Sequence, residues 1–192
     1  MAKGYTTKEK IENYILREID ESFDGQITEW IESVEQYIDN ATGRNFKADT
    51  VSSVRNYDGD NTSLLIVDDF VELTQVQIDT DTPLAINSEV YAYPLNKKPQ
   101  NRLKYYGGYF PASTPGSISV TAKWGYSVDV PSDIKFVAMV LVAGIVNFSN
   151  DAEGEVQSMS IGRYSVTYKT KQEVNDFEMA KKILEQYKKY TM

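Results

Sequence analysis

The sequence predicts an α+β protein: a small helical domain of about four helices, formed by both ends of the chain, with an inserted antiparallel β-rich subdomain and a β-hairpin before the last helix. Two changes of apolar spacing carry this prediction. Apolar residues recur at helical intervals in the first 50 residues, alternate between residues 51 and 130, and return to helical intervals from residue 131. The expected domains are therefore residues 1–50 together with 131–192, and residues 51–130.

The first two helices are expected to have well-defined ends. The first should begin at Thr6, because Glu9 three residues later completes a capping box. The second should follow Asp24 as its N-cap and stop at Gly43, where a glycine typically closes a helix. Its apolar residues form one stripe, and its carboxylates are expected on the opposite, solvent-facing side. These carboxylates are Glu29, Glu32, Glu35 and Asp39.

The middle of the chain is typical of β-structure. Runs of β-branched and aromatic residues, separated by Gly, Pro, Asn and Asp, predict five or six short, largely antiparallel strands. These runs are VSSVRNY, SLLIV, VELTQVQI, LAINSEVYAY and SISVTAKW. Asp58-Gly59 is expected to turn a hairpin between the first two runs, because this pair tolerates the positive φ of tight turns. Residues 99–116 are less regular and are expected to contain a long, aromatic-rich loop.

The C-terminal part is expected to contain two further helices. The third should start near Pro131-Ser132-Asp133, which is favourable N-terminal chemistry. Its uncharged run, residues 136–148, is far shorter than the roughly 20 residues that a bilayer crossing needs, so it is expected to be a core helix and not a membrane span. The last helix is expected over residues 173–190.

A hairpin is expected between these two helices. Gly162-Arg163 as a two-residue loop would pair Ile161 with Tyr164 and Met159 with Val166, placing four apolar residues on one face. A glycine bulge in one long strand is the alternative. The apolar face needs a cover, which could be the chain's own insert, a neighbouring subunit or a partner protein. An assembly role would favour the neighbouring subunit.

Composition restricts the chemistry that the chain can perform. The chain has neither cysteine nor histidine, which removes thiol nucleophiles, the serine–histidine triad and the commonest transition-metal ligands. The net charge is −8, and the blocks 1–50, 51–130 and 131–192 carry 6 basic against 11 acidic, 6 against 9, and 8 against 8 side chains. None of the three blocks shows the basic excess that a DNA-gripping groove needs. We expect no enzyme activity and no metal or other cofactor.

Two acidic motifs are compatible with metal binding or acid–base chemistry, but ordinary structural roles are favoured for both. Asp58 and Asp60 occupy the first and third positions of a calcium loop, but Ser63 and Asp69 stand where glycine and glutamate are required, which favours a hairpin connection over a metal site. Asp68-Asp69 could serve acid–base chemistry, but adjacent strand residues face opposite sides. A hydrolase that uses carboxylates alone is therefore the weakest of the functional hypotheses.

Aromatic residues gather in the second half of the predicted insert. They could stack on sugars or on single-stranded nucleic acid, but core packing or a protein interface is the favoured interpretation. These residues are Tyr105, Tyr106, Tyr109, Phe110, Trp124 and Tyr126. A carbohydrate or cell-surface binding module is the alternative function, and it would use Trp124 and Tyr106.

The order of these segments resembles the head–tail connector (adaptor, or head-completion) proteins of long-tailed bacteriophages and prophages. The resemblance covers nearly the whole chain, and its most specific parts are ITEWIESVEQYIDNATGRNF (27–46), residues 124–142 and residues 156–168. The insert is longer than a minimal adaptor requires.

The resemblance implies a virion structural protein at the head–tail interface, assembled in the host cytoplasm, with no active site. About twelve subunits would form a ring beneath the portal protein and receive a tail-side connector or stopper protein, while double-stranded DNA passes through without specific binding. The acidic excess of twelve copies would sum to on the order of a hundred negative charges, which would let DNA slide.

The expected partner-binding residues lie in the hairpin and the last helix. The terminal segment is expected to dock against the portal by a helix-in-groove contact, and the hairpin to meet a neighbouring subunit. These residues are Met159, Ile161, Arg163, Tyr164, Val166, Tyr168, Phe177, Met179, Ile183, Leu184, Tyr187 and Tyr190.

Overall fold

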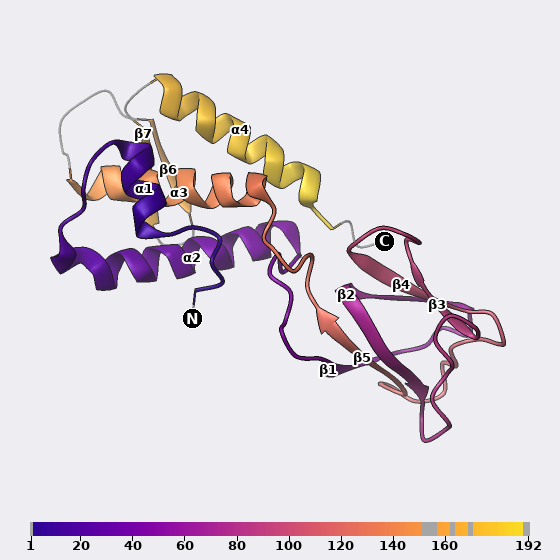
Figure 1. Cartoon of the computed structure of the whole chain (residues 1–192). Helices are drawn as coiled ribbons and strands as arrows, with labels where there is room; N and C mark the ends of the chain where they lie inside the picture. Colours follow the sequence, from indigo (N-terminus) through magenta and orange to yellow (C-terminus); the bar gives the residue numbers. More distant parts are fainter. Residues whose placement is uncertain (1, 151–156, 162–163, 169–170, 190–192) are drawn as a thin grey trace. The chain divides into compact units, whose positions relative to one another are not determined.

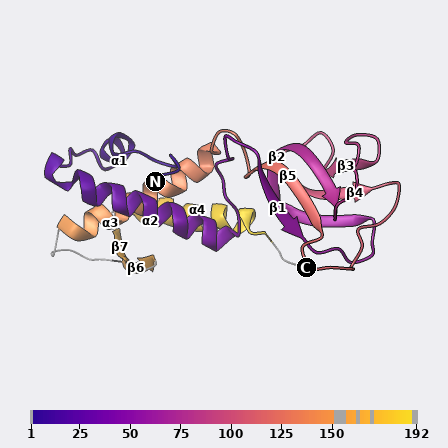
Figure 2. The same ribbon diagram turned by 90° about the horizontal axis from the view of Figure 1, so that it is seen from below.

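The structure, a computed structural model, describes residues 2–150, 157–161, 164–168 and 171–189, with side chains over 2–147 and 171–189. The chain forms two compact units, Met1–Arg44 with Val130–Met192, and Asn45–Asp129. We call them the helical unit and the β unit (Figures 1 and 2). The described residues contain four α-helices and a five-stranded antiparallel sheet, which confirms the predicted α+β fold class.

The helical unit is built around α3 (Ser132–Asn150). This helix lies against α1 (Lys8–Ile15), α2 (Asp24–Thr42), α4 (Lys171–Tyr187) and strand β7 (Tyr164–Tyr168). Figure 1 shows α3 running between α2 and α4. Every residue from 140 to 147 is buried, because a helix that is apolar on all sides is stable only where neighbours surround it. The core-helix prediction is confirmed, and no helix of the described segments is long and apolar enough to span a bilayer.

Helix α1 begins one residue later than predicted. Its N-cap is Thr7, whose hydroxyl accepts a 3.4 Å hydrogen bond from the N–H of Lys10. The predicted capping box of Thr6 and Glu9 is therefore wrong. Thr6 is unsuited to the cap because its side chain is buried where the N-terminal segment packs onto the helical unit.

A turn of 3₁₀-helix, η1 (Glu21–Phe23), runs directly into α2. Asp20 caps this turn by accepting a 2.8 Å hydrogen bond from the N–H of Ser22. Asp24 is therefore the first residue of α2 and not its N-cap. Gly43 ends α2 in the left-handed conformation, at φ 68°, which confirms the predicted C-terminal glycine.

The prediction that all four carboxylates of α2 face solvent is wrong for two of them. Glu35 is 2% exposed and Asp39 is 8% exposed. Both accept hydrogen bonds from the N-terminal segment, residues 3–5, which covers them. Glu29 lies on the exposed side as expected.

The hairpin before the last helix has the predicted register. Strand β6 (Gln157–Ile161) pairs antiparallel with β7, with Ile161 opposite Tyr164 and Met159 opposite Val166. Strand β7 lies against α3, which was not among the three covers expected from the sequence. The hairpin therefore has a neighbour in its own helical unit.

The β unit is a single curled sheet with the strand order β1-β5-β2-β4-β3. The strands are β1 (Ser53–Tyr57), β2 (Leu64–Ile78), β3 (Val90–Tyr93), β4 (Gln100–Tyr105) and β5 (Ile118–Trp124). Two runs predicted as separate strands form the one long strand β2, in which register shifts mark irregularities at residues 66–70, 70–72 and 73–75. The inward-facing side chains form one core: Leu65, Val67, Phe70, Val76, Val90, Leu103, Phe110, Ile118, Val120, Ala122 and Trp124.

The predicted hairpin at Asp58-Gly59 is wrong. Strand β5 lies between β1 and β2, so the segment after β1 crosses to a different part of the sheet. Gly59 is needed for space and not for positive φ, since a Cβ there would lie 2.2 Å from the carbonyl oxygen of Pro111. The Asp-Gly pair thus marks a close approach of two loops.

The predicted long loop over residues 99–116 contains strand β4. Its sequence has low strand propensity, but its inward-facing Leu103 is fully buried between Leu65 of β2 and Ala92 of β3. Packing between two neighbouring strands decides the conformation here, because β-propensity is weak compared with context.

Candidate assembly surfaces

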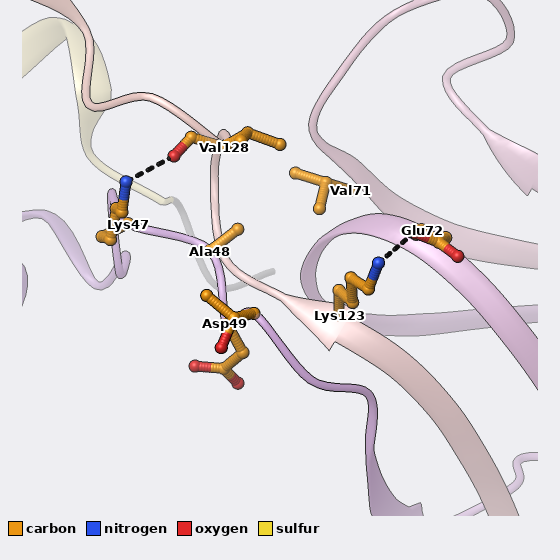
Figure 3. Close-up of a pocket in the computed structure, with 8 residues that line it drawn as sticks. Lys47, Ala48, Asp49, Val71, Glu72, Lys123 and Val128 are labelled. Carbon is orange, nitrogen blue, oxygen red and sulfur yellow. Dashed lines mark hydrogen bonds and ion pairs between the residues drawn. The ribbon is translucent and has the colours of Figure 1, made fainter.

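In the recesses of the β unit, polar side chains form ion pairs and hydrogen bonds with other groups of the same unit. The pocket in Figure 3 has a volume of about 350 Å³ and lies beside the segment that enters β1. Lys123 forms a 2.6 Å ion pair with Glu72, and Lys47 donates a 2.8 Å hydrogen bond to the carbonyl of Val128. The two pairs lie at opposite ends of the pocket, so they do not converge on one point as an acid and a base would.

The acidic loop after β1 lines a second shallow recess. Its two carboxylates, Asp58 and Asp60, accept hydrogen bonds that hold the loop in its conformation. Asp58 accepts a 2.6 Å hydrogen bond from the N–H of Gly116. Asp60 accepts hydrogen bonds from the hydroxyl and the N–H of Thr62 at 2.7 and 2.9 Å, which lowers the pKa of Asp60. These bonds fold the loop, and the described residues hold no group of three or more carboxylates suited to a metal ion.

The aromatic cluster of the insert divides between the core and the surface. Trp124 is 1% exposed and contacts Phe70 edge-on, with ring centroids 6.1 Å apart. Phe110 is fully buried, whereas Tyr106 and Tyr109 are both largely exposed. Trp124 therefore cannot stack on a sugar, and the surface aromatics are tyrosines.

The outer face of the sheet is lined by apolar, aromatic and basic side chains. Two cross-strand rows run over β2, β4 and β3, because directly opposed residues share a face. The rows are Leu64–Lys104–Tyr91 and Ile66–Arg102–Tyr93, and Tyr106 lies beside them. We call these seven residues the outer face.

Contacts among the tyrosines order this outer face. The hydroxyls of Tyr93 and Tyr106 are 2.9 Å apart, and this hydrogen bond raises the pKa of Tyr93. Tyr91 packs edge-on against Tyr106 with ring centroids 5.1 Å apart, and the Lys104 ammonium lies 5.4 Å from the centroid of the Tyr106 ring. Ile66, at the β2 end of its row, remains 59% exposed. Preorganised aromatic and basic side chains around exposed aliphatic ones are typical of protein interfaces.

The partner-binding residues predicted on α4 do not share one environment. Phe177 and Leu184 are each 7% exposed and belong to the helical core, while Met179 is 55% exposed. Ile183 and Tyr187 are half-buried. Tyr190 lies outside the described residues, as do the side chains of the hairpin residues Met159, Ile161, Tyr164, Val166 and Tyr168 and all of Arg163.

The C-terminal end of α4 is bonded to the rest of the helical unit. The Tyr187 hydroxyl donates a 2.8 Å hydrogen bond to Asp133 at the start of α3. The Arg44 guanidinium donates a 2.6 Å bond to the carbonyl of Tyr187, and the N–H of Lys189 donates to the carbonyl of Thr42 at 2.8 Å. This end of α4 is therefore a structural junction with α2 and α3.

The N-terminal half of α4 is held as well. Tyr14 of α1 donates a 2.9 Å hydrogen bond to Asp176, and burial together with this bond raises the pKa of Tyr14. The buried Asn147 of α3 donates a 2.9 Å bond to Glu173. Helix α4 thus contacts the bundle along its length, and its exposed side is the part available to a partner.

Sequence reasoning missed the buried carboxylates Glu35 and Asp39. Glu35 accepts from the backbone N–H groups of Lys3 and Tyr5 at 2.5 and 2.8 Å. Asp39 accepts a 2.6 Å bond from the Tyr5 hydroxyl and an ion pair from the Lys3 ammonium. The local signal that the sequence offered is their i, i+4 spacing beside the apolar stripe of α2, which places both carboxylates on one side of the helix.

Comparisons with known proteins agree with the order of segments in this chain. A family model described as "Head completion protein" matches residues 6–190. No curated protein sequence matches the chain.

Two solved structures are similar in fold. A chain in "Neck of empty GTA particle computed with C6 symmetry" aligns at a TM-score of 0.58 and 11% identity, covering 96% of this chain and 89% of that one. A chain in "Neck of native GTA particle computed with C12 symmetry" aligns at 0.55 and 10% identity, covering 89% and 86%. At these identities the likeness concerns the fold, and it extends over both units.

Proposed function

Because the chain belongs to the head completion protein family, we propose that it is a ring-forming adaptor beneath the portal, at the vertex where the tail joins the capsid. Its role is that of a structural head–tail connector protein. The observation that carries the proposal is the family match over residues 6–190, which includes the β unit as well as the helices. In this role the chain works by binding other subunits and has no need of an active site.

About twelve copies would close the ring. The neck structures that share the fold were computed with C6 and C12 symmetry, which supports a ring whose order is twelve. A closed ring uses heterologous interfaces, so every subunit presents two different surfaces to its neighbours. Double-stranded DNA would pass through the opening without specific contacts, because a net charge of −8 per subunit repels phosphates.

The portal and a tail-side connector or stopper protein are the proposed partners on the two sides of the ring. The exposed side of α4, with Met179 and Ile183, is the proposed portal contact, and the β6–β7 hairpin is the proposed contact with a neighbouring subunit. Phe177 and Leu184 act indirectly, because they hold α4 on the bundle from their buried positions. The particle neck is the proposed location of the assembled ring.

The experiment is to image the purified chain by negative-stain electron microscopy with and without its cognate portal ring. We expect a second ring of twelve subunits on one end of the portal. A chain that stays monomeric and never binds the portal would contradict the proposal. Removing everything after residue 170 is unsuitable as a variant, because the loss of Phe177, Ala180 and Leu184 would remove part of the helical core.

A second candidate function rests on the exposed tyrosines of the outer face. Tyr91, Tyr93 and Tyr106 form a connected aromatic group that could receive a sugar ring in a carbohydrate-binding tail protein. Polysaccharide binding by the full chain that is lost on Tyr106→Ala would support it. Binding that Tyr106→Ala leaves unchanged, or no binding at all, would exclude it.

A further inference from the structure

The segment that joins α1 to α2 presents an apolar side chain to solvent at a strained backbone position. Leu16 follows α1 with φ 54°, in the left-handed region that favours glycine, and its side chain is 90% exposed. Its N–H closes the helix on the carbonyl of Glu12, a task that glycine would perform without strain. A leucine here therefore costs stability within the subunit, and a contact outside the subunit explains it better.

Phe23 and three carboxylates accompany Leu16. Phe23 is 43% exposed, and Glu18, Asp20 and Glu21 are all exposed. Residues 16–23 contain one basic and three acidic side chains. We call residues 16–23 the α1–α2 tip, and Figures 1 and 2 show it at the end of the helical unit where α2 begins.

The outer face of the β unit has similar apolar content and the opposite charge. Leu64 is 40% exposed and Ile66 is 59% exposed, and each is opposed across the strand pair by a basic residue, Lys104 or Arg102. From residue 90 to residue 128 the sequence contains five basic residues and no acidic one. No carboxylate among the described side chains forms an ion pair with Arg102 or Lys104.

We propose that the α1–α2 tip of one subunit docks on the outer face of the β unit of the next copy. The inference rests on the proposed ring, because a closed ring needs two different, complementary surfaces on every subunit. Leu16 and Phe23 would be buried against Leu64 and Ile66. The acidic groups of the tip would face Arg102 and Lys104, and this complementarity would fix the orientation of successive subunits.

DNA is a poorer occupant of the outer face. Phosphates would bind Arg102 and Lys104, but the exposed Leu64 and Ile66 in the same rows offer nothing to a sugar–phosphate backbone. A foreign protein on the outer face would leave the exposed Leu16 unexplained. A second copy covers both surfaces with one contact.

A disulfide cross-link tests the contact directly, since the chain has no cysteine of its own. Two single variants, Leu16→Cys and Ile66→Cys, are mixed on the cognate portal ring and oxidised. We expect a covalent dimer that contains one chain of each variant, because a disulfide forms only between Cα atoms about 4.4–6.8 Å apart. The matched control is Val54→Cys in place of Ile66→Cys, an apolar site of nearly the same exposure, 60% against 59%, on the edge strand β1.

Charge reversal supplies the second arm. Arg102→Glu with Lys104→Glu should weaken ring formation about tenfold or more, and Glu18→Lys with Glu21→Lys should do the same. Combining the four substitutions in one chain should restore part of the loss. Leu16→Gly should weaken ring formation while the thermal midpoint of the monomer stays equal or rises.

The outcomes separate this inference from the proposed function. If the unmodified chain forms no ring on the portal, the proposed function fails. If the unmodified chain forms rings, but the Leu16–Ile66 cross-link is absent and the charge-reversed chains assemble fully, the docking inference alone is overturned. A heterotypic cross-link together with rescue by the combined reversal supports it.

Discussion

The hydroxyl of Tyr5 donates a 2.6 Å hydrogen bond to the carboxylate of Asp39, and both side chains are buried in the helical unit. The bond joins the N-terminal segment to the middle of α2. Glu35 strengthens the same attachment one turn earlier, by accepting the N–H of Tyr5 at 2.8 Å. Residues 3–5 are thus held on the bundle.

Tyr5→Phe should lower the free energy of unfolding of the helical unit by about 1.5–3 kcal/mol, the usual worth of a hydrogen bond to a charged group. Urea unfolding measures it in a Trp124→Phe background, where Trp30 is the remaining tryptophan and reports the helical unit. Gln36→Ala on the exposed side of the same helix is the control and should change the value by less than about 0.5 kcal/mol. Equal effects of the two variants would contradict the buried anchor.

Gly125→Ala should destabilise the β unit. The segments that enter and leave the β unit run side by side at Gly125, and a Cβ there would lie 2.5 Å from the Cα of Ala48. The φ of Gly125 is +132°, a value that residues with a side chain rarely adopt. Hydrogen exchange measured by mass spectrometry should show faster exchange in β5 and β1 and no change in α3. Gly25→Ala is the matched control, since nothing lies within 4 Å of its Cβ position and alanine favours the helix. Unchanged exchange in Gly125→Ala would refute the close approach.

Leu184→Ala and Met179→Ala should have different effects, because Leu184 lies on the side of α4 that packs on the bundle and Met179 lies on its exposed side. Leu184 is 7% exposed, so its truncation should cost about 2–5 kcal/mol of unfolding free energy. Met179 is 55% exposed, and its truncation should cost less than about 0.5 kcal/mol. If the exposed side of α4 is the portal contact, Met179→Ala should weaken portal binding in a sedimentation assay while the protein stays folded. Full binding by this variant would remove Met179 from the contact.

The β unit should lose stability between about pH 10 and pH 12. Burial raises the pKa of Tyr57 to about 12 from its ordinary value of 10. Because the folded pKa is the higher one, the stabilisation is complete below pH 10 and is lost as the pH rises towards the folded pKa. Tyr57→Phe should flatten this part of the stability profile, and it should remove one late-titrating group from the tyrosinate absorbance curve. An unchanged curve would contradict the burial of this phenol.

The hairpin and the helices could be predicted because their signals are local. Gly162-Arg163 between two alternating runs predicted a hairpin in which Ile161 pairs with Tyr164, and the structure has this register. The all-round apolar sequence of α3 likewise predicted a helix surrounded by others. Periodicity and turn chemistry within about a dozen residues sufficed for these elements.

Three features depend on contacts with residues far away in the sequence: the existence of strand β4, the path of the chain at Gly59 and the burial of Glu35. Leu103 becomes a strand residue because Leu65 and Ala92 flank it, and Gly59 is required because the carbonyl of Pro111 approaches it. Glu35 is buried because the N-terminal segment brings two N–H groups to it. The candidate surfaces follow the same division: the acidic, apolar residues 16–23 can be read along the chain, whereas the outer face exists only after β2, β4 and β3 pair.

Sequence alone determined the fold class and the family, because both rest on local patterns in a fixed order. Tertiary structure decided which charges are buried and which apolar residues are exposed, because these depend on contacts between distant segments.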